Sequence, residues 1–252
     1  MNFTEDIKDG IQKSADSFYF LWNNTSILFY LSILLYVKIA LAFLSASCRS
    51  CTPNSFVSFL LMHAPVQFLM QGFIFFAQVC IAYHCNDIVK KIPTSIYSCI
   101  KKAHTHYIKI ILWTSINFLI LFFFKNVVRI YSTPNIEAFL GLLASAATTV
   151  TIFVPVSIAI DSCPFLKNIT NTVEYFYKHF FFILGGLLWL GLVNILSMIF
   201  FSGSYFVNYV APQIYSNFIF LQIICSLNFT VQWVINSAYA VFISLIYLKH
   251  KN

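Results

Sequence analysis

The sequence predicts an all-α integral membrane protein with six transmembrane helices arranged as three hairpins. Composition is the first observation: 60% of the residues are hydrophobic, only 9% are charged, and the mean hydropathy is +0.80. Soluble domains are about one quarter charged. The other two observations are that the chain contains six long apolar stretches and that its basic residues are concentrated in alternate loops. We therefore interpret residues 1–252 as a single six-span membrane domain.

Each apolar stretch is long enough to cross a bilayer, which takes about 20 helical residues. The expected spans cover roughly residues 26–47, 56–84, 107–124, 137–160, 180–201 and 216–248. The second and sixth exceed the thickness of the hydrocarbon core, so these helices must tilt, kink or extend past it. Pro65 and Pro155 predict kinks in the second and fourth spans, because proline removes a backbone donor.

The basic residues predict the orientation. Eleven lie on one side of the six spans: Lys8, Lys13, Lys90, Lys91, Lys101, Lys102, Lys109, Lys167, Lys178, Lys249 and Lys251. Three, namely Arg49, Lys125 and Arg129, lie on the other. Cytoplasmic loops are enriched in Lys and Arg, so both termini are expected in the cytoplasm. Basic residues beside apolar runs also account for the net charge of +7 without a nucleic-acid partner.

The N-terminal residues and the cysteines exclude two other interpretations. The first sixteen residues contain four acids and no small-residue cleavage site, so we expect no signal peptide. Of the seven cysteines, only Cys48 and Cys51 have a suggestive spacing, and no second pair completes a zinc site. A local disulfide and two free thiols both stay open for this pair.

A short amphipathic segment precedes the first, third and fifth spans. Apolar residues recur at helical spacing in each: Ile7, Ile11, Ala15 and Phe18; Ile96, Ile100, Ala103 and Tyr107; Leu166, Ile169, Val173 and Phe176. Such helices are suited to lying along a membrane surface. Residues 11–31 align without gaps on 100–120, and an Ile and an aromatic residue stand seven residues apart in all three segments. We interpret the chain as three repeats, each an interfacial helix followed by a two-span hairpin.

Two stretches carry a resemblance to a known family: GFIFFAQVCIAYHCNDIVKKIPTSIYSCIKKAHTHYIKIILWTSI (72–116) and AATTVTIFVPVSIAIDSCPFLKNITNTVEYFYKHF (146–180). With this layout, the chain resembles six-helix bacterial integral membrane proteins of unknown function, related to the membrane domain of some glycerophosphodiesterases. The third amphipathic segment departs from the pattern, because it lacks the basic residues of the second. The resemblance implies the fold and a bacterial inner membrane, and it brings no activity to transfer.

Polar residues form a stripe on the second span and another on the sixth. His63, Gln67, Gln71 and Gln78 share one helical face, and so do Asn228, Gln232 and Asn236. Exposed to lipid, such groups are costly, so we expect them to face other helices. Two explanations stay open. The amides form hydrogen bonds between helices, each worth about 1 kcal/mol or less, or they line a polar groove that binds a ligand.

Lys38 lies near the middle of the first span, where a charge costs about 2.5–3.5 kcal/mol. Its long side chain could reach the membrane surface, it could be neutral, or it could face the polar stripes as part of a binding site. Together with His63 and the six amides it forms the candidate ligand-binding set.

The sequence contains no P-loop, nucleophile elbow, zinc-protease motif or pair of acids at catalytic spacing. The basic loop with His84, His104 and His106 is expected to face solvent and headgroups, not to hold a metal. We therefore expect a non-enzymatic protein without cofactor or metal that binds or moves a lipid or other amphiphile. The alternative is a structural partner of other membrane proteins, with the amides as hydrogen-bond glue.

Overall fold

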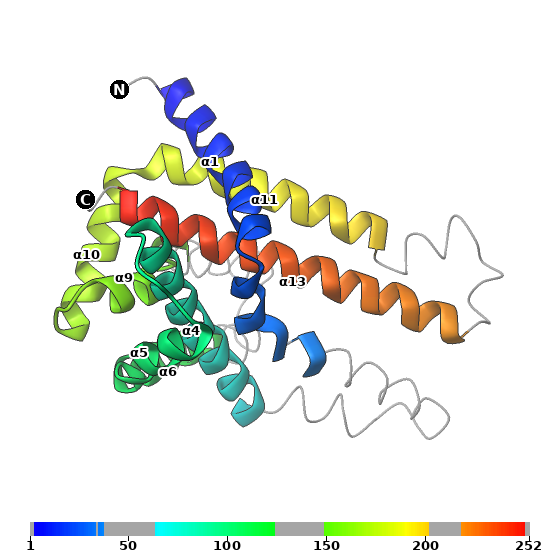
Figure 1. Ribbon diagram of the computed structural model, residues 1–252, viewed down its shortest axis with the longest axis horizontal. Helices are drawn as coiled ribbons and strands as arrows, with labels where there is room; N and C mark the ends of the chain where they lie inside the picture. The colour runs from blue at the N-terminus through cyan, green and yellow to red at the C-terminus, as the bar shows by residue number, and fades with distance from the viewer. Residues whose placement is uncertain (1–2, 34, 38–63, 124–148, 202–217, 250–252) are drawn as a thin grey trace. The chain divides into compact units, whose positions relative to one another are not determined.

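The computed structural model describes residues 3–33, 35–37, 64–123, 149–201 and 218–249, and throughout these ranges every regular element is helical (Figure 1). The elements are α1 (Phe3–Asn23), η1 (Thr25–Leu28), α4 (Ala64–Val89), α5 (Ile96–His104), α6 (Tyr107–Phe123), α9 (Val154–Ile160), α10 (Phe165–Lys178), α11 (Phe180–Phe201) and α13 (Phe218–Lys249). The expectation of an all-α protein is confirmed for this part of the chain.

Three of the described helices are long and apolar enough to cross a membrane. The qualifying segments are Pro65–Val89, Phe180–Ser197 and Ser226–Lys249, in α4, α11 and α13. Helix α6 coincides with the predicted third span, and its described apolar part, Tyr107–Ile120, is shorter. Half of the predicted first span and half of the predicted fourth span lie outside the described residues, so the count of six stays a prediction.

Two local expectations are wrong. Residues 85–89, expected in a loop, continue α4 by a further turn, and buried Cys85 and Asp87 account for this extension. Pro155 does not kink a continuous helix. Residues 151–153 form a turn, and the proline lies in the first turn of the short helix α9, where its missing N–H is not needed.

The chain divides into two compact units, residues 1–67 with 181–242, and residues 68–180 with 243–252. In the first unit, α1 and α11 pack closely through glycines. A Cβ atom on Gly10 would overlap the carbonyl oxygen of Phe182, and one on Gly185 would lie 2.9 Å from Ile7 Cα. Small residues at such positions let two helix backbones approach closely.

Side chains of α13 complete the first unit. The indole of Trp233 donates to the carbonyl oxygen of Leu28 at 3.1 Å. The amide of Gln232 donates to Ser197 Oγ of α11 at 3.0 Å. These two hydrogen bonds join α13 to η1 and to α11.

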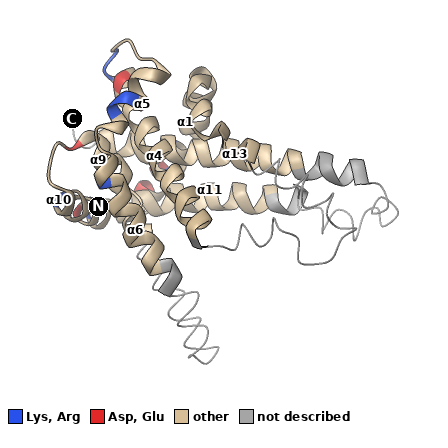
Figure 2. Ribbon diagram, turned by 90° about the horizontal axis from the view of Figure 1, so that it is seen from below, with Lys and Arg blue, Asp and Glu red and all other residues tan. Residues whose placement is uncertain are grey.

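The second unit contains α5, α6, α9, α10 and most of α4, together with the last turns of α13. Aromatic contacts between Phe68 and Phe118 and between Phe75 and Trp113 pack α4 against α6. Charged residues are found around α5 and on α10, whereas α6 has none after Lys109 (Figure 2). The Lys109 ammonium donates to the carbonyl oxygen of Cys163 at 2.7 Å and ties α6 to the loop before α10.

The three amphipathic segments are helices α1, α5 and α10, and most of their buried residues are small or polar, with Leu21 and Phe176 as the large apolar exceptions. Under the alignments that pair Ile11, Ile100 and Ile169, these buried residues occupy equivalent positions: Gly10, Cys99 and Asn168, then Ser14, Ala103 and Thr172. Several large apolar side chains stay outside, including Trp22 at 81% exposure and Leu166 at 74%. This division is typical of helices that rest on protein with one face and on lipid with the other.

The glycine contact between α1 and α11 generates the first prediction. Gly185→Leu should lower the melting temperature in detergent by several degrees, because its side chain meets backbone atoms of Ile7 that cannot move aside. The matched control is Gly191→Leu on the same helix, where a Cβ atom meets nothing within 4 Å. Equal melting temperatures for the two variants would contradict the proposed packing.

Candidate functional site

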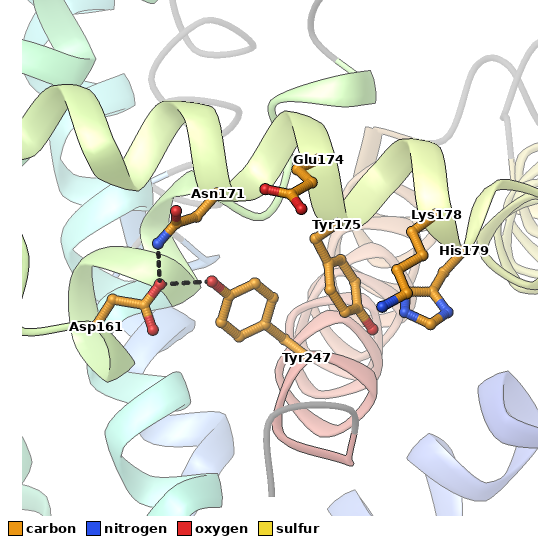
Figure 3. Close-up of a pocket in the computed structure, with 7 residues that line it drawn as sticks. All are labelled: Asp161, Asn171, Glu174, Tyr175, Lys178, His179 and Tyr247. Carbon is orange, nitrogen blue, oxygen red and sulfur yellow. Dashed lines mark hydrogen bonds between the residues drawn. The ribbon is translucent and has the colours of Figure 1, made fainter.

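The second unit contains an open cavity of about 230 Å³ between α9, α10 and the end of α13 (Figure 3). Seven residues line it, all of them polar or aromatic: Asp161, Asn171, Glu174, Tyr175, Lys178, His179 and Tyr247. The cavity is smaller than the ~300–1,000 Å³ that drug-sized ligands occupy. It is suited to a small polar group, or to the polar end of a larger molecule.

Helical spacing places most of these side chains on one face of α10. Asn171, Glu174, Tyr175 and Lys178 follow one another at intervals of three, one and three residues, and His179 caps the helix. Residues three and four apart lie on the same side of an α-helix. Asp161 is the C-cap residue of α9, where the chain turns back toward α10. Tyr247 approaches from the last turn of α13.

One carboxylate oxygen joins the three helices. Asp161 Oδ2 accepts hydrogen bonds from Tyr247 Oη at 2.7 Å, Ser157 Oγ at 2.8 Å and Asn171 Nδ2 at 3.3 Å. Asp161 is 6% exposed and Tyr247 4%. A buried carboxylate needs such donors, because removing its charge from water is costly. The donors come from α9, α10 and α13, so this oxygen fixes the inner end of the cavity.

A second buried contact holds α10 against α9. The Asn168 side chain is fully buried, and its Nδ2 donates to the carbonyl oxygen of Ser157 at 2.9 Å and to Ser157 Oγ at 3.0 Å. Ser157 therefore supports both Asn168 and Asp161. The contact determines how far α10 lies from the end of α9, and with it the width of the cavity.

Aromatic rings form the wall behind the polar groups. The Tyr175 ring lies 4.9 Å from that of Tyr247, 5.1 Å from that of Phe153 and 4.8 Å from that of His179. The Tyr175 hydroxyl donates to the carbonyl oxygen of Ile246 at 2.8 Å, in the last turn of α13. Burial raises the pKa of the Tyr175 phenol, and the neighbouring Tyr247 adds to the effect. Tyr175 is therefore a neutral hydroxyl at physiological pH.

The charged groups are separated along the cavity (Figure 3). Asp161 lies at one end with Asn171, and Lys178 lies with His179 at the other; Glu174 is on the rim between them. Glu174 and Lys178 are exposed, and neither takes part in an ion pair with any residue that the structure describes. Both charges are therefore available to a ligand at the mouth.

None of the residues predicted to bind a ligand lines this cavity, and two of them are not among the described residues. Lys38 and His63 are outside the described residues. Gln71 and Gln78 lie half-buried on α4 in the second unit, whereas Gln67, Asn228, Gln232 and Asn236 belong to the first. Gln232 is bonded to α11, and Asn236 is exposed. Contact between the two stripes stays a prediction.

The loop expected to expose a histidine cluster is more buried than predicted. His84 and Asp87 are both buried in the last turns of α4. Asp87 Oδ2 accepts from the Lys102 ammonium of α5 at 2.6 Å. Lys102 corresponds to Asn171 in the repeat, so the second and third surface helices each donate to a buried carboxylate from the same position. Among the described residues, no group of three His, Cys, Asp or Glu side chains could hold a metal ion.

The cavity was not predicted from the sequence, although the spacing of the polar residues in α10 indicated part of it. The polar side chains of α10 recur at helical spacing beside Asp161, but we interpreted this segment only as an amphipathic helix at the membrane surface. Tyr247 could not be added from local patterns, because it contacts Asp161 across 86 residues of chain.

No family model, curated protein or solved structure matches the chain. The family resemblance of residues 72–116 and 146–180 therefore stays a prediction, and the function must be argued from the geometry.

The contact between Asn168 and Ser157 generates the second prediction. Asn168→Ala should lower the free energy of unfolding by about 1–3 kcal/mol, because it removes two buried hydrogen bonds to Ser157 and leaves a cavity in place of the amide. Thr170→Ala is the matched control, since that hydroxyl is exposed and bonds only within α10. Denaturant unfolding in detergent measures both. An Asn168→Ala variant as stable as the control would contradict the role of this contact.

Proposed function

We propose that this protein binds or moves a lipid or other amphiphile in a bacterial inner membrane, without catalysing a reaction. In this proposal the chain crosses the membrane six times, as three hairpins each preceded by an interfacial helix, with both termini in the cytoplasm. The polar end of the ligand enters the cavity between α9, α10 and α13. The cavity lined by seven polar or aromatic residues is the observation that carries the proposal.

The lining residues of the cavity are close in sequence to the ends of two candidate spans, which supports a ligand that lies partly in the membrane. His179 is followed at once by Phe180, where one candidate span begins, and Tyr247 lies two residues before Lys249, where another ends. A group held there would be close to the membrane surface, with apolar chains able to stay in the bilayer.

The side chains of helices α1, α5 and α10 also support a ligand-binding site close to the membrane surface. Exposed apolar side chains remain on each of them, for example Tyr19 on α1, Tyr97 on α5 and Tyr177 on α10. Aromatic residues favour the membrane–water interface. Exposed lysines such as Lys101 and Lys167 would add attraction to anionic lipid.

The intramembrane amides support both the proposal and its alternative. The buried Oδ1 atoms of Asn194 and Asn228 form no hydrogen bond with any residue that the structure describes, and buried acceptors of this kind favour a polar ligand or water beside them. The bond between Gln232 and Ser197 instead favours the second candidate function, a structural partner of other membrane proteins with the amides as interhelical glue. Lys38 and His63 remain members of the proposed groove by sequence alone.

Filling the cavity tests the proposal and is the third prediction. Asn171→Trp places a large ring where the headgroup would enter, so the purified variant should retain at least about tenfold less lipid. The measurement is native mass spectrometry after incubation with mixed vesicles of phosphatidylethanolamine and phosphatidylglycerol. Thr170→Trp is the control, because Thr170 is the exposed neighbour on the same helix and does not line the cavity. Undiminished lipid on folded Asn171→Trp would overturn the proposal.

Removing an amide separates the two candidate functions and is the fourth prediction. If Gln232 acts only as glue, Gln232→Leu should change the free energy of unfolding by about 1 kcal/mol or less and leave lipid retention unchanged. If the amides also line a ligand path, the same variant should lose lipid at nearly unchanged stability. Ser197→Ala removes the partner hydroxyl and shows how much of any effect belongs to the hydrogen bond.

A further inference from the structure

We propose that the cavity recognises the headgroup of a zwitterionic phospholipid, one that carries a primary ammonium group beside its phosphate. The ammonium would lie toward Asp161 and the phosphate toward Lys178. This inference rests on the proposed function and names the chemical class of its ligand.

The arrangement of charge matches a dipolar headgroup. Asp161 lies at one end of the cavity, Lys178 and His179 lie at the other, and Glu174 and two tyrosine rings lie between them (Figure 3). A purely anionic headgroup would meet repulsion at the Asp161 end. A purely cationic one would leave Lys178 without a counterpart.

The inner end of the cavity attracts a cation. Asp161 Oδ2 accepts hydrogen bonds from Ser157, Asn171 and Tyr247, and these three neutral donors orient the carboxylate. Two carboxylates and one lysine line the cavity. The carboxyl ends of α9 and α13 also lie near Asp161, and helix carboxyl ends carry partial negative charge.

The chemistry of this end favours a primary over a quaternary ammonium. The Asp161 carboxylate, the Asn171 carbonyl and the Tyr247 hydroxyl can each accept a hydrogen bond from an N–H group. A quaternary ammonium has none to donate. The rings of Tyr175 and Tyr247 border the same space and favour a cation of either kind.

Lys178 supplies the phosphate-binding group at the opposite end. It stands in the last turn of α10, where a lysine also complements the helix dipole, and this structural role alone needs no ligand. Its position in the cavity lining and its lack of an ion pair with the described residues make its charge available to an anion. The volume of about 230 Å³ leaves room for a headgroup but not for acyl chains.

The experiment measures binding of short-chain lipids to the full-length protein in detergent by isothermal titration. Dihexanoyl phosphatidylethanolamine should bind at least about tenfold more tightly than the phosphatidylglycerol and phosphatidylcholine analogues with the same chains. Glu174→Gln and Asp161→Asn should abolish this preference, and Lys178→Met should weaken both phosphatidylethanolamine and phosphatidylglycerol. Because Glu174 and Lys178 are exposed, their variants test the assignment even if Asp161→Asn fails to fold.

The outcomes separate this inference from the proposed function. Equal affinity for all three lipids, with Asn171→Trp still abolishing binding, would overturn the headgroup assignment and leave lipid binding intact. No binding of any lipid, and no effect of Asn171→Trp, would overturn both. Binding of free phosphoethanolamine as tight as that of the lipid would replace the membrane ligand with a soluble one.

Discussion

The arrangement of the second unit depends on a single carboxylate oxygen. Asp161 Oδ2 accepts hydrogen bonds from α9, α10 and α13, and every element that borders the cavity is tied to it directly or through Ser157. Because a buried carboxylate is costly unless its acceptor sites are filled, these donors cannot move apart independently. The cavity is therefore a preorganised feature of the helix junction, so a ligand would not have to assemble it.

A second constraint acts on the surface helices. Each of α1, α5 and α10 places small or polar residues against the protein, so their apolar side chains stay available for lipid. In α10 this division also affects the cavity, because the side chains that line it project away from the exposed apolar face of the helix. In the proposed function, the same helix rests on the membrane with Leu166 and Tyr177 while it presents Asn171 and Lys178 to a headgroup.

Helix positions were largely predictable from the sequence, and the site was not. Hydropathy placed α11 at residues 180–201 and α6 at 107–124, because apolar runs of that length have few alternatives. Apolar periodicity located the three surface helices. The extension of α4 to Val89 was missed, since buried Asp87 and its bond to Lys102 depend on tertiary contact. The cavity was missed for the same reason: it joins Asp161 to Tyr247, and no local pattern relates the two.

The depth of α10 in the membrane is the most direct test of this account. A spin label replaces Tyr177, which is 87% exposed, in a version of the protein without its native cysteines, reconstituted in vesicles. Collision rates with oxygen and with a water-soluble nickel complex then measure its depth. The account predicts a label at the boundary between headgroups and acyl chains, with a control label at exposed Lys90 in the aqueous phase. A Tyr177 label as accessible to nickel as the Lys90 control would show that α10 does not rest on the membrane, and would contradict the account.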